Sequence, residues 1–478
     1  MSKRLIMILT LAFVVGVSFA AYAEVQNIKV SGDIEVMSVF RENFDLAGKD
    51  EDDGSGNDRL SDLRQKNENI FLTFARIRTD ADLTDNVSAS IRLLSEFIWG
   101  REDSTNSNYV TRDSDRGVYL DLAYITLKEF LYSPLTLVVG RQELHYGNDM
   151  IIGDSSTNRI DWHGSIPSDL SKRKAFDAVR AILDYNPLTV DLVYSKIRSQ
   201  AETNLDANSE RVGDYRDDDT DLYGINAKYD FGRKNLIAEG YYWYRRIGPR
   251  AYTIGTQAYH ADQLHTIGAR VSAEPIENLT AQVEYAIQRG RYNGTASDTA
   301  DRHVNKYFAY ALETSLTYNW KKAKYTPSLT ALFAQFSGES VTDNSDRTNR
   351  YRGWDPMYEN QTFGRIANAL MAQSNVRLVG LAGSFKPLDD VTVKGEAYNY
   401  WAVDAYDNGE VTTYWGATAQ NHGDNRNLGE EVDITLTYDY TEDVQLNLMA
   451  DTFIPGGAWG DRTNHTASEV LGSMKVTF

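Results

Sequence analysis

Apolar and polar side chains alternate at every residue over many short stretches of this chain. The pattern is clearest in residues 279–288, where Leu, Ala, Val, Tyr and Ile alternate with Thr, Gln, Glu, Ala and Gln. A period of two indicates a β-strand with one face in an apolar environment and the other in water. The same alternation is found in residues 266–273, 308–318, 431–438, 444–451 and 470–478.

Weaker strand patterns raise the total to eighteen predicted strands. The alternation is ambiguous in one of them, because Val138 and Val139 are both apolar. The twelve further strands are residues 28–41, 70–83, 87–98, 118–128, 135–143, 176–185, 189–197, 221–231, 235–245, 324–336, 375–386 and 391–401.

Eight short turns alternate with nine long polar loops between these strands. Four of the turns contain a proline, which cannot donate to a β-ladder and therefore marks its end. These are Pro134, Pro187, Pro275 and Pro387. The pattern predicts an all-β fold, a closed transmembrane antiparallel β-barrel of about 18 strands with short periplasmic turns and long extracellular loops.

Both ends of the chain support export to an outer membrane. Residues 1–23 have a basic start, an apolar run and small residues before Glu24, as in a secretory signal peptide. Residues 24–478 then form a single barrel domain. The last strand ends at Phe478, and its apolar phase with a terminal aromatic resembles the signal read by the outer-membrane barrel assembly machinery. Outer-membrane lipid and this machinery are the expected partners.

Composition narrows the possible chemistry. The formal charge of −19 argues against a nucleic-acid partner, because binding a nucleic-acid backbone needs a basic face. Cysteine is absent and the seven histidines are scattered, so we expect no cofactor, no catalytic residues and no metal site built from them. The 30 tyrosines, 17 phenylalanines and 8 tryptophans suit two interfacial girdles of a barrel. Asp217, Asp219 and Asp221 have a spacing that suits calcium, although a solvated acidic loop is the default interpretation.

Charged residues on the polar phase of the strands are candidates for the lining of a pore. Cations and carboxylates occur together there, so the lumen is expected to be of mixed charge, and neighbouring charges can pair and brace the wall. The candidates read from strand phase are Arg76, Arg78, Arg92, Glu96, Asp121, Arg180, Lys228, Arg270, Glu284, Lys394, Glu396 and Asp433.

Several segments resemble the alginate-export family of outer-membrane proteins. The longest runs from Gly140 to Gly153, and the likeness continues through residues 175–180, 353–358 and 428–433. The resemblance implies an eighteen-stranded barrel that conducts anionic polysaccharide through a lumen lined with arginines. It adds Arg141, which lies in the longest matching segment, to the pore-lining candidates.

Three classes of function remain open at this point. The first is a passive outer-membrane channel for hydrophilic solutes, with anionic saccharides as candidates. The second is an outer-membrane enzyme that acts on lipid or glycan through carboxylates or through His145 and His163. No nucleophile-elbow, zinc or paired-acid motif supports it, so we expect no enzyme. The third is a secreted soluble β-protein, which does not explain the alternation of short turns and long loops.

Overall fold

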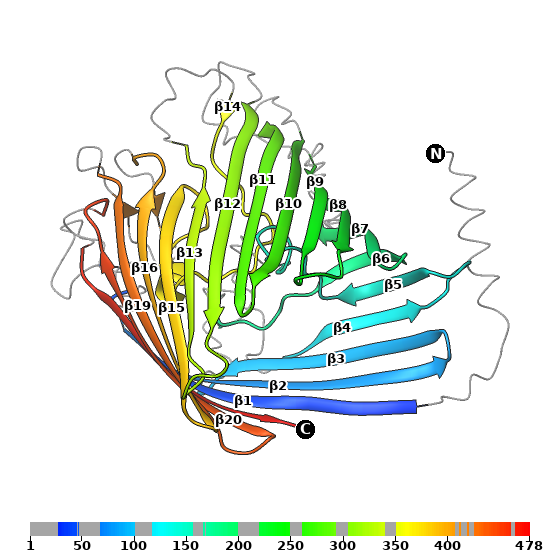
Figure 1. Cartoon of the computed structure of the whole chain (residues 1–478), viewed down its shortest axis with the longest axis horizontal. Coiled ribbons are helices and arrows are strands. Elements are labelled where there is room, and N and C mark those ends of the chain that lie inside the picture. Colours follow the sequence, from blue (N-terminus) through cyan, green and yellow to red (C-terminus); the bar gives the residue numbers. More distant parts are fainter. Residues whose placement is uncertain are drawn as a thin grey trace, which may run out of the picture.

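The computed structural model describes residues 27–44, 46, 67–100, 117–155, 166–167, 169–198, 219–248, 261–292, 305–339, 350–406, 411–412, 418–419, 425–459 and 464–478. Within these residues, eighteen long strands follow one another around a closed barrel (Figure 1). They are β1 (Asn27–Glu42), β2 (Asn67–Thr84), β3 (Val87–Ile98), β4 (Val118–Leu127), β5 (Leu135–Gln142), β6 (Phe176–Asp184), β7 (Leu188–Arg198), β8 (Thr220–Asp230), β9 (Ile237–Ile247), β10 (Asp262–Ile276), β11 (Leu279–Tyr292), β12 (Asn305–Asn319), β13 (Ser328–Phe336), β15 (Val376–Leu388), β16 (Val391–Ala402), β19 (Asn427–Asp439), β20 (Val444–Pro455) and β21 (Ala467–Thr477).

Each long strand pairs antiparallel with its neighbours, and the first strand closes the barrel by pairing with the last. Gly32 donates its backbone N–H to the carbonyl of Phe478 at 2.8 Å beside this seam. Closure leaves no strand edge unpaired, as a membrane requires. Every predicted strand overlaps one of the eighteen, so the predicted fold class is confirmed.

A few short elements accompany the barrel. The two-residue strand β14 (Arg350–Tyr351) pairs parallel with β12, and β17 (Val411–Thr412) pairs with β18 (Thr418–Ala419). One short helix, α3 (Arg365–Leu370), lies against the inside of the barrel. Among the described residues, no helix is long and apolar enough to span a membrane.

The two faces of the wall differ as the alternation predicted. Val283, Ile267 and Leu316 point outward and are exposed, whereas Glu284 and Gln288 point inward and are buried. Exposed aromatic side chains form a band at each end of the outer surface. At the end with short turns they include Tyr132, Tyr185, Tyr229, Phe231, Trp320, Tyr325, Tyr440 and Phe478, and at the end with long loops Phe71, Trp99, Tyr194, Tyr223 and Phe308.

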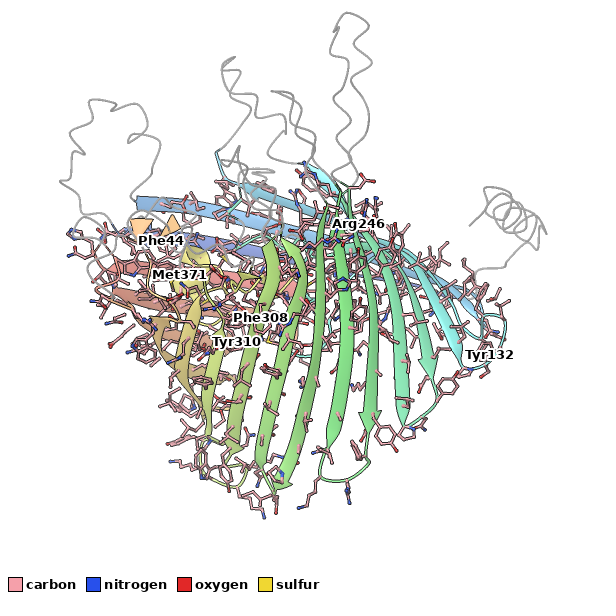
Figure 2. All side chains as sticks on the ribbon, turned by 90° about the horizontal axis from the view of Figure 1, so that it is seen from above. Phe44, Tyr132, Arg246, Phe308, Tyr310 and Met371 are labelled. Atoms are coloured by element: carbon pink, nitrogen blue, oxygen red, sulfur yellow. The ribbon has the colours of Figure 1, made fainter. Side chains whose placement is uncertain are left out.

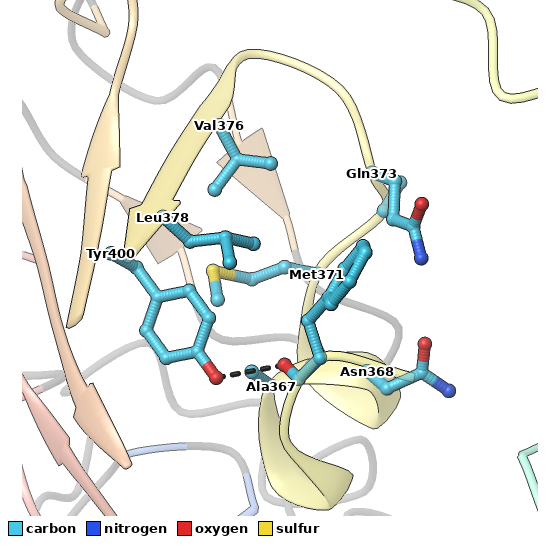
Figure 3. A pocket seen from close by; sticks show the side chains of 9 residues that line it. Ala367, Asn368, Met371, Gln373, Val376, Leu378 and Tyr400 are labelled. Carbon is cyan, nitrogen blue, oxygen red and sulfur yellow. Dashed lines mark hydrogen bonds between the residues drawn. The ribbon is translucent and has the colours of Figure 1, made fainter. Parts of the chain in front are cut away.

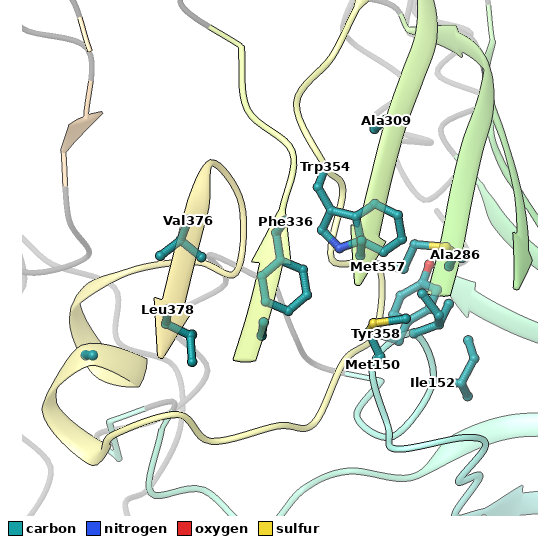
Figure 4. Packing of buried hydrophobic residues seen from close by; sticks show 14 of the residues in the cluster. Met150, Ile152, Ala286, Ala309, Phe336, Trp354, Met357, Tyr358, Val376 and Leu378 are labelled. Carbon is teal, nitrogen blue, oxygen red and sulfur yellow. The ribbon is translucent and has the colours of Figure 1, made fainter. Parts of the chain in front are cut away.

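The described parts of two long loops lie inside the barrel. We call residues 143–155, 166–167 and 169–175 loop A, and residues 337–339 and 350–375 loop B. The loops bind each other, since Gly153 donates its backbone N–H to the carbonyl of Tyr358 at 2.7 Å, and Tyr358 donates to Ile151 at 3.0 Å. Their apolar side chains pack against apolar residues on the inner wall, so the main hydrophobic core lies inside the barrel (Figure 4). This core includes Met150, Ile152, Ala286, Ala309, Phe336, Trp354, Met357 and Tyr358.

Candidate functional site

Carboxylates on the inner wall hold the tip of loop A. Glu284 accepts the backbone N–H of Asn148 at 2.8 Å, and Glu239 accepts that of Gly147 at 3.1 Å. The side chain of Asn148 donates to Glu313 at 3.2 Å and accepts from Arg270 at 2.6 Å. Gly147 has a φ of 64°, and a Cβ there would lie 2.5 Å from a carboxylate oxygen of Glu284. Only glycine therefore allows this close approach.

Loop B is held in the same way along the opposite part of the wall. Glu431 accepts the backbone N–H groups of Ile366 and Ala367 at 2.7 and 2.8 Å. Arg365 donates from Nε to Asp451 at 2.7 Å. A buried carboxylate needs such donors, because an unpaired buried charge is strongly destabilising. Much of the negative charge on the inner wall is therefore engaged by the loops.

A second contact fixes the middle of loop B. Asp355 binds Arg245 on β9, with Nη1 to Oδ1 at 2.9 Å, and its backbone N–H donates to Gln288 at 2.9 Å. Where the loop continues past α3, an apolar pocket lies between the helix and the wall, and Tyr400 donates its hydroxyl to the carbonyl of Phe363 at 2.7 Å (Figure 3). Ala367, Met371, Val376 and Leu378 also line this pocket.

Cations inside the barrel are also paired, but they are more exposed than their partners. Arg173 of loop A binds Glu96 at 2.7 Å, and their side chains are 22% and 2% exposed. Arg180 donates from Nε to Asp191 at 2.7 Å, with exposures of 29% and 4%. Arg365 is 22% exposed and Asp451 is fully buried. In each pair the guanidinium meets the water of the lumen and the carboxylate lies behind it.

In five further pairs inside the barrel, the cation is also more exposed than its carboxylate partner. We call the cations of these pairs, together with Arg173, Arg180 and Arg365, the lumen cations. The further pairs are Arg76–Asp33, Lys172–Glu35, Lys174–Asp154, Arg270–Glu239 and Lys394–Glu396. Arg92 is more exposed than Asp121 but less exposed than its second partner, Glu143. Arg41 and Arg245 are nearly buried and bind Glu469 and Asp355 in the packed interior, so we do not count them among the lumen cations.

The structure places twelve of the thirteen pore-lining candidates on the inner face. Their role in permeation remains a prediction, and the carboxylates among them differ in environment. Glu96, Asp121, Glu284 and Asp433 are buried behind cations or loops. The other eight are Arg76, Arg78, Arg92, Arg180, Lys228, Arg270, Lys394 and Glu396.

The expectation that Arg141 lines the pore is wrong. Its strand is paired without a register shift, so Arg141 shares a face with Val139, which is exposed on the outside. Arg141 binds Asp177 on β6 at 3.3 Å, and here the carboxylate is the more exposed partner, at 62% against 29%. Val138, the other apolar residue, is buried on the inside. The two apolar valines therefore lie on opposite faces of the strand, which is why its alternation is ambiguous.

The lumen cations that lie on the loops are not among the residues expected from the strand pattern. Lys172, Arg173 and Lys174 are three consecutive basic residues in an acidic chain, which was an available signal. Arg173 also stacks on Tyr119, with its guanidinium 3.5 Å from the ring centroid. Arg365 has no comparable signal, because only the folding of loop B brings it to the wall.

The structure locates one of the histidines considered for an enzyme and two of the aspartates considered for a calcium site. His145 binds Asp149 through Nδ1 at 2.9 Å, and this contact raises the pKa of the imidazole. His163 lies outside the described residues, as does Asp217. Asp219 and Asp221 both bind the ammonium of Lys196, at 2.6 and 3.0 Å. In the part of the chain that the structure describes, no group of three or more metal-ligating side chains is arranged to hold an ion.

A closed barrel with an apolar outer belt and a charged inner wall is a channel for hydrophilic solutes in an outer membrane of the Gram-negative type. The chain belongs to the alginate export family, whose pattern matches residues 35–473. Both the family and the fold are of the channel type. No curated protein matches the chain.

Solved structures with a similar fold are outer-membrane channels. OccK8 (OprE) of Pseudomonas aeruginosa matches with a TM-score of 0.52 at 10% identity, over 95% of this chain and 99% of that one. OccAB4 of Acinetobacter baumannii gives the same values. OccK2 (OpdF) of Pseudomonas aeruginosa, solved in complex with glucuronate, matches with a TM-score of 0.50 at 12% identity, over 95% and 99% of the two chains.

Proposed function

We propose that this channel conducts acidic saccharides of the uronate class. The observation that carries the proposal is the order of exposure in the lumen ion pairs, in which the cation faces the solute and the carboxylate lies behind it. A solute carboxylate then meets cations first, although the chain as a whole is acidic.

Paired cations suit passage better than unpaired ones. Inside a protein tube the effective dielectric is well below that of water, so an unpaired arginine would hold a carboxylate tightly. A guanidinium that already binds a buried carboxylate keeps a fixed position and offers a weaker attraction. Several such sites in succession favour entry and still allow release.

The relatives support the same class of solute. The family is named for alginate export, and the structure of OccK2 was solved with glucuronate. Alginate and glucuronate both carry one carboxylate on each sugar ring, and a carboxylate is the group that the lumen cations can bind.

Block of ion current in a planar bilayer tests the proposal. We expect oligouronate to block the wild-type channel at concentrations at which a neutral oligosaccharide of the same length does not. Arg173→Gln/Arg180→Gln should weaken the block by oligouronate about tenfold, since each charged hydrogen bond contributes roughly 1.5 kcal/mol and only part of it is lost. Arg141→Gln is the matched control, because it removes an outward-facing arginine. Equal block by the neutral sugar, or equal loss in the control, would contradict the proposal.

We further propose that passage involves no covalent step. Among the described residues, the imidazole of His145 forms its hydrogen bond with Asp149 and none with a hydroxyl group, which supports transport without catalysis. Incubation of the folded protein with oligouronate should return the oligomer at its original length. A shortened product that is lost in His145→Gln would contradict this part of the proposal.

The proposed partners during biogenesis are the barrel assembly machinery and outer-membrane lipid. Phe478 is exposed on the apolar phase of β21 beside the seam with β1, which supports a role as assembly signal. We expect deletion of Phe478 to reduce the amount of folded protein in the membrane, measured by heat-modifiable migration on electrophoresis. Wild-type amounts would contradict this role.

A further inference from the structure

The outer wall of β7–β12 carries three ordered rows of side chains near the loop end. The lowest row is apolar and contains Leu192, Ile225, Tyr242, Ile267, Ile287 and Tyr310, which follow one another through the cross-strand register. The second row lies two residues closer to the loops and contains Tyr194, Tyr223, Tyr244, His265, Arg289 and Phe308. Figure 2 labels Tyr310, Phe308 and Arg246 on this part of the wall.

The second row is a continuous aromatic band. The rings of Tyr194 and Tyr223 have centroids 5.1 Å apart, and those of Tyr244 and His265 are 4.6 Å apart. Aromatic bands on outer-membrane barrels lie where the hydrocarbon core meets the headgroups. The row therefore fixes the height of the outer membrane interface on this wall.

The third row lies directly above this interface and is rich in cations. Moving along β7 to β12 it contains Lys196, Asp221, Arg246, Gln263, Arg291 and Lys306. Arg289 joins them from the aromatic row, with its guanidinium 3.8 Å from the centroid of Phe308. Two residues along a strand span about 7 Å, so these cations reach the depth of the lipid headgroups.

The carboxylate of this row, Asp221, lies between Lys196 and Arg246, away from the cations on β11 and β12. Arg291 and Lys306 are direct cross-strand neighbours, and both are exposed. Like charges in this position destabilise a sheet unless an anion lies between them. Among the described residues, no carboxylate forms an ion pair with Arg289, Arg291 or Lys306. An anion bound between Arg291 and Lys306 would relieve this repulsion.

Outward-facing cations are sparser on the rest of the wall that the structure describes. Other outward positions at the loop end carry Glu42, Asn399, Glu430 or Thr452. The isolated arginines Arg141 and Arg377 each bind a side chain on a neighbouring strand, Asp177 and Gln335. The chain as a whole has a formal charge of −19, so this cluster of positive charge stands out from the rest of the chain.

We propose that Arg289, Arg291 and Lys306 form a binding site for the phosphate groups of the phosphorylated glycolipid in the outer leaflet. Cations and aromatic rings at one interface provide two contacts for such a lipid, since guanidinium and ammonium groups bind its phosphates while the rings lie against its sugar and acyl region. The site is on the outer wall and is independent of the solute proposed for the lumen.

The test measures binding of bisphosphorylated lipid A to the full chain in neutral detergent micelles, by native mass spectrometry. We expect Arg289→Gln/Arg291→Gln/Lys306→Gln to lose on the order of a hundredfold in affinity, because each basic residue near an anionic surface contributes roughly a fivefold change. The control, Arg141→Gln/Arg377→Gln, removes two outward-facing cations on other parts of the wall and should bind as the wild type does. Heat-modifiable migration establishes that each variant is folded.

Two measurements on the wild type need no variant. Lipid A stripped of both phosphates should bind far more weakly than the bisphosphorylated form. Inorganic phosphate at millimolar concentration should not displace the lipid. Equal binding of the stripped lipid, equal loss in the control variant, or full displacement by inorganic phosphate would each overturn the proposal.

Discussion

Two ion pairs on neighbouring strands show how differently the two faces of the barrel wall use the same side chains. On the inner face, Arg180 is partly exposed and Asp191 is buried behind it, where it also accepts the hydroxyl of Tyr146 at 2.9 Å. On the outer face, Arg141 is the less exposed partner and Asp177 extends away from the wall. The sign of the charge that a solute meets is therefore set by which partner of each ion pair is more exposed, and not by the formal charge of the wall.

On the inner wall, the carboxylates are buried because the loops cover them. Carboxylates that face the lumen find donors in the backbone and side chains of loops A and B, as Glu284 does with Asn148 and Glu431 does with Ile366. The outer wall has no such cover, so its charges stay near the rim, where water and headgroups solvate them.

The largest difference in the free energy of unfolding should appear when a charged side chain is placed on one face or the other in the middle of the wall. Val283→Arg should lower the free energy of unfolding by about 2 to 4 kcal/mol, because the side chain points outward into hydrocarbon. Ser315→Arg, on the neighbouring strand with its side chain inward, should cost much less. Urea unfolding in phospholipid vesicles measures both variants. Equal losses would mean that the two faces are not separated as the register indicates.

A smaller effect should separate the two ion pairs themselves. Asp191→Asn removes a buried acceptor of Arg180 and Tyr146, so we expect a loss of about 1 to 3 kcal/mol. Asp177→Asn removes an exposed partner and should change the free energy of unfolding by less than about 1 kcal/mol. The same unfolding assay applies. A larger loss for Asp177→Asn would reverse the assignment of inner and outer faces in this region.

The smallest effect should come from the pH dependence of loop A. The hydrogen bond with Asp149 raises the pKa of His145. The protonated form is thus favoured in the folded state, and its contribution is fully present below the ordinary histidine pKa of about 6.5 and lost as pH rises through the raised value. The difference in unfolding free energy between the wild type and His145→Gln should follow this course. A difference that grows with pH would have the wrong sign.

The strands could be predicted from the sequence, but the filling of the lumen could not. Alternation is a local signal, and it gave the number and the order of the strands and the phase of β10 to β12. It was ambiguous at Val138 and Val139, which are both apolar but lie on opposite faces. Arg141 was expected from the family resemblance, and it lies on the outer face. The inward folding of the loops depends on contacts such as Arg245 with Asp355, which are distant in sequence and leave no periodic trace.

Ion selectivity tests the central claim most directly, namely that exposed lumen cations dominate over the carboxylates buried behind them. The measurement is the reversal potential of the reconstituted channel in a salt gradient. We expect the wild type to favour anions, Arg173→Gln/Arg180→Gln to shift toward cations, and Arg141→Gln to leave the potential unchanged. A cation-selective wild type, or a shift with Arg141→Gln as large as with the lumen variant, would contradict the claim.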